Sequence, residues 1–187
     1  GGVASDVERA VADRLTRQCD TIEREVRDLR QVYDEHSGLQ DRFMTTGQVP
    51  PPLAARLGLT GLAGRASAQA ADLRCDQPWA PYDQLAVNMA TRTGGDVAAR
   101  VAVRFDEVFE SLRLIRILLL RLGESDRGSD IRGELRLPAK LALGAGWIEG
   151  WRGEVFVALE WDGERGANRI RRCHCHDPSW QNWPVLE

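Results

Sequence analysis

Apolar side chains recur at steps of four and three residues along two long stretches of the chain. In the first stretch the positions are Leu15, Cys19, Ile22, Val26, Leu29 and Tyr33. In the second they are Val101, Phe105, Val108, Leu112, Ile115, Leu119 and Leu122. This spacing marks one face of an α-helix. The pattern predicts helices over about residues 5–35 and 96–122, packed lengthwise against each other or a common partner.

The segment between these helices, about residues 45–93, is rich in Gly, Ala and Pro, and this composition predicts a long loop. Within it, "PPPLAARLG" predicts one short helix that begins with proline and ends at Gly58. A loop of this length is unusual inside a compact domain and is often functional. After it, Asp96 is placed to cap the second long helix and Gly123 to end it.

The pattern changes again after Gly123. Residues 123–145 are expected to form a polar linker, and about residues 146–187 a β-hairpin region. There "EVFVALEW" alternates in part, "DGERGAN" supplies turn residues, and "RIRRCHCH" supplies a return strand that Asp177 and Pro178 stop. The expected fold is therefore α+β and mainly helical, a single partial domain over residues 1–187 with a late antiparallel hairpin.

Composition narrows the class of protein. The 187 residues, 43% of them apolar, suffice for one domain with a hydrophobic core, and a net charge of −3 argues against nucleic-acid binding. The most apolar run, "LRLIRILLLRL", carries Arg113, Arg116 and Arg121, which excludes a membrane span. The four cysteines do not resemble a disulfide scaffold, and no signal peptide opens the chain, so a cytoplasmic location is expected. The opening "GGVASD" fits either a tag scar or a piece of a longer polypeptide.

The stretch "RCHCH" places two Cys and two His in four consecutive positions, 173–176. Side chains alternate faces along a strand, so Cys173 and Cys175 point one way and His174 and His176 the other. One tetrahedral zinc cannot take all four ligands from such a segment, and no CxxC occurs in the chain. We therefore expect no metal here and partly buried cysteines on an ordinary strand.

Several motifs occur in order along nearly the whole chain. They are "GGVASD", "DLRCDQPWAPYDQL", "TRTGGDVAARVAVRFDEVFESLRLIRILL", "GWIEGWRGEVFVALEWDG" and "RCHCHDPSWQNWP". Together they resemble the large subunit of membrane-bound [NiFe] hydrogenases of the formate hydrogenlyase and hydrogenase-4 type. That family is homologous to the quinone-proximal large subunit of respiratory complex I.

The resemblance implies an oxidoreductase subunit at the cytoplasmic face of a membrane complex, next to an iron–sulfur subunit and membrane subunits. In the hydrogenase branch, nickel and iron are held by two CxxC motifs near the ends of the subunit. Neither motif lies within these residues, so the segment resembles a central-to-late portion without the metal ligands. No cofactor is therefore expected in this chain, and the chain alone is expected to be inactive.

Two candidate catalytic residues follow from the resemblance. Arg152 in "WRGEV" matches the arginine that hangs over the open face of the metal pair, where a permanent positive charge can polarise hydrogen or hydride. Alternatively, Arg152 is a structural turn residue that pairs with Glu149 or Glu154. Asp83 belongs either to a proton path or, with Asp72, Arg74 and Tyr82, to a polar network that ties the loop to the core. Trp151 stands where the best-known hydrogenases have proline.

Three functions from different classes remain open. The first is a portion of a hydrogenase large subunit. The "DPSWQNWP" segment favours it, because the corresponding segment of the complex I subunit resembles Ala-Pro-Gly-Phe instead. The second is a complex I-like version, in which a quinone replaces the metal site and the electrons derive from NADH. The third is a metal-free relative with a scaffolding role. Finding two CxxC motifs in the parent polypeptide would establish the hydrogenase function.

Overall fold

The computed structural model describes residues 7–124, 137–163 and 169–185. The "GGVASD" opening, part of the expected linker and most of the "DGERGAN" turn lie outside these residues. The described helices are α1 Arg9–Glu35, α2 Ser37–Phe43, α3 Pro51–Leu57, α4 Gly61–Ala66, α5 Leu73–Asp76, α6 Val97–Glu124 and α7 Ser179–Asn182. Two short 3-10 helices, η1 Tyr82–Gln84 and η3 Trp183–Val185, and the strands β1 Ala142–Gly150, β2 Gly153–Asp162 and β3 Arg169–His176 complete the described elements.

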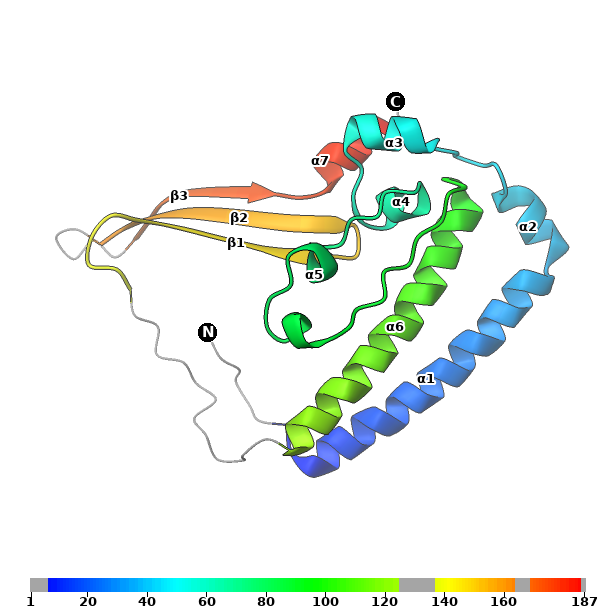
Figure 1. Cartoon of the computed structure of the whole chain (residues 1–187), viewed down its shortest axis with the longest axis horizontal. Coiled ribbons are helices and arrows are strands. Elements are labelled where there is room, and N and C mark those ends of the chain that lie inside the picture. Colours follow the sequence, from blue (N-terminus) through cyan, green and yellow to red (C-terminus); the bar gives the residue numbers. More distant parts are fainter. Residues whose placement is uncertain (1–6, 125–136, 164–168, 186–187) are drawn as a thin grey trace.

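The long helices α1 and α6 lie side by side and run in opposite directions (Figure 1). Ion pairs join them at two places along their length, from Arg30 to Asp106 at 3.0 Å and from Arg116 to Asp20 at 2.8 Å. Part of each apolar stripe faces the other helix, since Cys19, Leu112 and Leu119 are buried. Other positions of both stripes stay exposed to solvent.

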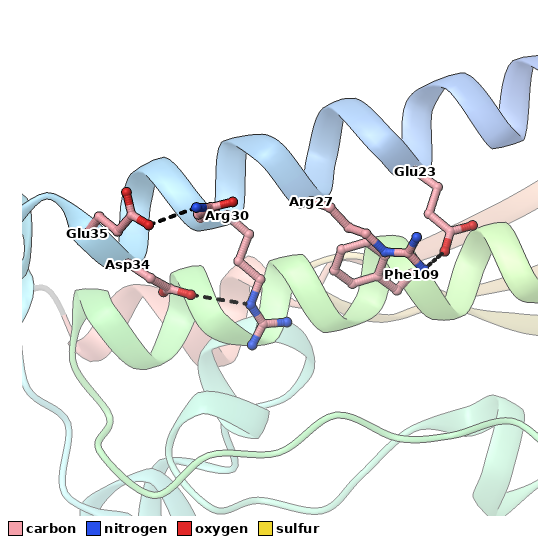
Figure 2. Close-up of a pocket in the computed structure, with 7 residues that line it drawn as sticks. Glu23, Arg27, Arg30, Asp34, Glu35 and Phe109 are labelled. Atoms are coloured by element: carbon pink, nitrogen blue, oxygen red, sulfur yellow. Dashed lines mark hydrogen bonds and ion pairs between the residues drawn. The ribbon is translucent and has the colours of Figure 1, made fainter.

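A shallow groove of about 500 Å³ runs along this helix pair. Its α1 side chains are mutually paired: Arg27 with Glu23, Arg30 with Asp34, and Gln31 with Glu35 (Figure 2). Phe109 from α6 forms part of its wall. Because these charges already have partners on the same helix, the groove is a solvated helix surface and not a candidate reaction site.

The expected loop over residues 45–93 contains more regular structure than its composition indicated. The short helix at "PPLAARL" is confirmed, and Gly58 ends it in the left-handed conformation at φ +64°. The helices α4 and α5 in this loop were not expected, and neither was α2, which precedes it. Tertiary backbone bonds hold this region, including Gly95 N–H to Ala66 O at 2.8 Å and Val49 N–H to Gly95 O at 2.9 Å. Such bonds stabilise short helices that local propensity alone does not predict.

Asp96 caps α6 as expected. Its Oδ1 accepts the backbone N–H of Ala99 at 2.7 Å, and its Oδ2 accepts that of Thr45 at 2.8 Å. The same carboxylate therefore starts the helix and ties it to the segment after α2. Behind it, Ala66, Ala99 and Val103 form a small buried cluster between α4 and α6.

The late β-structure is a three-stranded antiparallel sheet in the order β1-β2-β3 rather than a hairpin. The expected linker is accordingly shorter, because β1 already begins at Ala142. The sequence around Gly144 and Gly146 did not predict a strand, because glycine is disfavoured in strands. Antiparallel pairing with β2 nevertheless holds β1 in the extended conformation. The sheet's β1–β2 turn lies beside α4 and α7, while its other end projects away from the helices (Figure 1). The expected mainly helical α+β class is confirmed.

Candidate functional site

Trp151 and Arg152 form the tight turn between β1 and β2, at the end of the sheet nearest the helices. The Arg152 side chain is 53% exposed, and its Nη2 lies 3.4 Å from Oδ2 of Asp177. Its guanidinium carbon lies 5.5 Å from the centre of the Trp151 ring. The expected alternative partners were Glu149 and Glu154, but Glu149 pairs with Arg65 instead. The acidic partner in the structure is Asp177.

Backbone contacts on two sides fix the position of this turn. On one side, the N–H of Leu62 donates to Trp151 O at 3.4 Å, and Gly61 packs directly on the peptide of Arg152. On the other side, Nδ2 of Asn182 donates to Arg152 O at 3.2 Å. A Cβ on Gly61 would lie 2.0 Å from the carbonyl carbon of Arg152, so only glycine allows this approach.

Arg152 lines a half-open pocket of about 470 Å³. The other walls come from the loop before α3, from α4, from α6 and from the C-terminal segment: Gly47, Gln48, Val49, Ala63, Arg100, Ser179, Asn182, Trp183 and Val185. Arg100 is held in place because its Nη1 donates to Gly95 O at 2.9 Å. Burial lowers the pKa of Arg100, although Asp96 nearby opposes this. The pocket thus combines apolar walls with two guanidinium groups.

Asp177 supplies the negative charge beside Arg152. The hydroxyl and the backbone N–H of Ser179 both donate to Asp177 Oδ1. These bonds, and after them the charge of Arg152, hold the pKa of Asp177 below its usual value. Asp177 therefore stays ionised at neutral pH, and the orientation of Arg152 depends on the segment that follows β3.

Behind the turn lies a buried ion cluster that sequence reasoning missed. Arg65 on α4 is 1% exposed. Its Nη2 lies 2.7 Å from Glu107 Oε1 on α6, and its Nη1 lies 2.8 Å from Glu149 Oε1 on β1. Burial alone would lower the pKa of Arg65, but Glu149 and Glu107 raise it overall. A lone arginine in "GLAGRAS" carries no sequence signal of burial, because its partners come from distant segments.

The expected polar network of the long loop is present in part. Asp72 is buried and accepts Nε of Arg74 at 2.9 Å and Nη2 of Arg74 at 2.6 Å. Asp72 Oδ2 also lies 3.8 Å from Nη1 of Arg65, which links the loop to the buried cluster. Asp83, by contrast, lies exposed in η1 and is not among the residues that line the Arg152 pocket.

The described residues do not provide the ligands of a nickel–iron centre. No group of three or more His, Cys, Asp or Glu side chains that could hold a metal occurs within residues 7–124, 137–163 and 169–185. Cys173 and Cys175 lie on β3, as expected, but both are exposed, so the expectation of partly buried cysteines was wrong. Neither lines the Arg152 pocket.

Comparison with known proteins identifies the family. Residues 1–144 match the family described as respiratory-chain NADH dehydrogenase, 49 kDa subunit. The chain belongs to this family. The carbon monoxide-induced hydrogenase of Rhodospirillum rubrum is 31% identical over 188 residues, which cover 100% of this chain and 50% of that protein. Formate hydrogenlyase subunit 5 of Escherichia coli K12 is 27% identical, over 100% of this chain and 32% of that protein.

Other relatives of this chain are subunits of NADH-quinone oxidoreductases. The C/D subunit of the NADH-quinone oxidoreductase of Bacteroides thetaiotaomicron is 29% identical over 91% of this chain and 32% of that protein. Among solved structures, a chain of the membrane-bound sulfane sulfur reductase, an archaeal respiratory membrane complex, superposes with a TM-score of 0.84. It shares 22% identity, covers 100% of this chain and 51% of that one, and shows the fold.

The chain spans only a third to a half of the length of these 49 kDa subunit relatives. Among the described residues, no helix has both the length and the apolar character needed to cross a bilayer. The Arg152 turn, its Asp177 partner and the Arg65 cluster therefore lie in a stretch that corresponds to only part of those relatives.

Proposed function

We propose that the chain is the central-to-late portion of the large subunit of a membrane-bound [NiFe] hydrogenase-like complex. The parent subunit interconverts molecular hydrogen and protons and passes electrons to an iron–sulfur partner subunit. One observation carries this choice: the two hydrogenase relatives match the chain over its full length. That length includes the β3–α7 segment, whose Asp177 pairs with Arg152.

Within this proposal, the chain supplies a wall of the redox site and not its metal ligands. A nickel–iron centre would be held by cysteines outside these residues, since the described residues offer no ligand set. Arg152 contributes a permanent positive charge, held on a rigid turn and oriented by Asp177. Asp83 remains a second candidate, as a carboxylate that carries protons, and its exposed position in η1 gives it access to solvent.

The parent subunit in this proposal is peripheral, on the inner face of the cell membrane, in contact with membrane subunits. The fold shared with a chain of a respiratory membrane complex supports this assembly. The finding that no described helix is suited to cross a bilayer is compatible with it.

The second candidate is a segment of a complex I-like NADH:quinone oxidoreductase, in which quinone replaces the metal centre. Two observations favour it: the family description itself, and the NADH-quinone oxidoreductase relatives at 28–34% identity. In that version, the mixed apolar and cationic pocket beside Arg152 suits a quinone head group. A metal-free scaffolding relative is the third candidate.

The test uses the full-length parent subunit, purified in its native complex. Nickel content, hydrogen-dependent dye reduction and NADH-dependent quinone reduction are measured on the same preparation. Stoichiometric nickel with hydrogen-dependent reduction is the expected result. Quinone reduction without nickel would instead establish the complex I-like candidate. Absence of both activities would establish the metal-free scaffolding relative. The 187-residue chain serves as the matched control and should show neither nickel nor hydrogen turnover.

A further inference from the structure

Cys173 and Cys175 bring two thiols together on the outer strand β3. They occupy alternate positions of the strand and therefore share one face of the sheet. Their Sγ atoms lie 3.5 Å apart, and both side chains are free and exposed. His174 and His176 point to the other face, where His176 contacts Gln181. The thiols are thus a preformed pair, separate from the Arg152 pocket.

The sheet leaves the space beside this pair open. On β2, Leu159 lies opposite Cys173 and Val157 lies opposite Cys175. On β1, Gly144 lies opposite Leu159 and Gly146 lies opposite Val157. A Cβ added at either glycine would meet nothing within 4 Å. This face therefore carries no side chain at these two β1 positions that could cover the thiols, and a third group can approach them from outside.

The spacing of the two sulfur atoms suits a shared ion better than a disulfide. Two zinc–thiolate bonds of about 2.3 Å at a tetrahedral angle place their sulfurs about 3.8 Å apart. A disulfide requires about 2.05 Å, and same-face neighbours on a strand have Cα atoms about 6.6–6.8 Å apart, at the limit of disulfide geometry. We propose that Cys173 and Cys175 form an open two-thiolate site for a soft divalent cation of the zinc and cadmium class.

Binding exchanges two S–H bonds for two metal–sulfur bonds and releases two protons. The chain supplies only these two ligands within its described part, so water or an outside group completes the coordination shell. The facing β2 residues, Val157 and Leu159, are apolar, and the nearby cations Arg171 and Arg172 are paired with Glu160. Because both thiols must lose their protons to bind the cation, apparent affinity should rise with pH.

The site can be tested with Cd²⁺ on the whole 187-residue chain. Cadmium is titrated in while the ultraviolet cadmium–thiolate absorption and the released protons are recorded. The expected result is one Cd²⁺ per chain, with two protons released. Cys173→Ser and Cys175→Ser should each weaken binding about a hundredfold or more, because a single thiolate lacks the effective concentration of the pair. Circular dichroism of each variant verifies that the fold is retained.

Two further variants make the assignment specific. The double variant Cys19→Ser/Cys75→Ser keeps the pair and should bind as the unchanged chain does. The double variant His174→Ala/His176→Ala should also bind normally, because those rings lie on the other face. Unchanged cadmium binding in Cys173→Ser, loss of binding in the histidine variant, or no binding by the unchanged chain would each overturn the proposal.

Discussion

Arg65 shows how strongly single residues depend on distant partners in this fold. Its guanidinium joins α4, α6 and β1 through Glu107 and Glu149. Removing one member of a buried ion pair leaves the other charge without compensation, and this typically costs more than the pair contributes. Burial raises the pKa of Glu149 even though Arg65 and the Leu73 N–H oppose the shift, so loss of Arg65 would leave this buried carboxylate without its cation.

We expect Arg65→Met to lower the free energy of unfolding by about 3–5 kcal/mol. The matched control is Arg56→Met on α3, where the arginine is exposed and the effect should stay within about 0.5 kcal/mol. Urea denaturation followed by tryptophan fluorescence measures both variants. Equal effects of the two substitutions would mean that the cluster does not stabilise the fold.

Arg152 is the residue on which the proposed function depends most directly. In the full-length parent complex, Arg152→Lys keeps a positive charge but replaces a rigid planar group with a mobile ammonium group. Loss of one preorganised charge contact costs about 3 kcal/mol, so hydrogen turnover should fall roughly a hundredfold while nickel content and assembly stay normal. Metal analysis and turnover assays on one preparation check this. Full turnover per metal centre would remove Arg152 from the candidate catalytic residues.

At the scale of elements, the critical contact joins the start of α4 to the β1–β2 turn. Gly61 and Gly58 both have positive φ angles, at +57° and +64°, but of these two only Gly61 packs on another segment. A Cβ added at Gly58 would have no neighbour within 4 Å. An alanine substitution at Gly58 therefore tests backbone strain alone, whereas one at Gly61 tests strain together with steric overlap.

Gly58→Ala should cost about 1–2 kcal/mol of unfolding free energy, because a left-handed residue with a Cβ is strained. Gly61→Ala should cost about 1–3 kcal/mol more, because its Cβ collides with the peptide of Arg152. Chemical denaturation of both variants measures the difference. A Gly61→Ala cost equal to that of Gly58→Ala would show that the turn can move away freely.

The sequence predicted the elements whose patterns are local. The stripes from Leu15 to Tyr33 and from Val101 to Leu122 specify α1 and α6, and Asp96 and Gly58 act as the caps expected of them. Strand β1 was missed because its glycines carry no side chains to reveal alternation. The Arg65 cluster and the Arg152–Asp177 pair were missed because they join residues 84 and 25 positions apart.

At the scale of the whole molecule, each long helix leaves an apolar row uncovered at intervals of seven residues. On α1 this row contains Ile22 and Leu29, at 44% and 58% exposure. On α6 it contains Val108, Ile115 and Leu122. Trp151 and Trp183 are also exposed near the pocket. The relatives are two to three times longer than this chain. Under the proposed function, the rest of the parent subunit and its partner subunits cover these rows.

The 187-residue chain alone should therefore associate with itself as its concentration rises. Sedimentation velocity over a concentration series should show the average mass increasing. The double variant Ile115→Lys/Leu122→Lys should shift this association to higher concentration without loss of helix content. A single monomeric species throughout the accessible range would contradict the expectation.

The clamped β1–β2 turn also has a consequence for the order in which the protein folds. Its supports lie far apart along the chain, with Arg65 and Glu149 separated by 84 positions and Arg152 and Asn182 by 30. Loop closure over such distances follows the formation of local helices. On the ribosome, α1 to α6 emerge first and can assemble, while Arg152 obtains its last backbone partner only after Asn182 has left the exit tunnel. We therefore expect the turn that holds Arg152 to be completed late in the synthesis of this segment, after the helices that precede it.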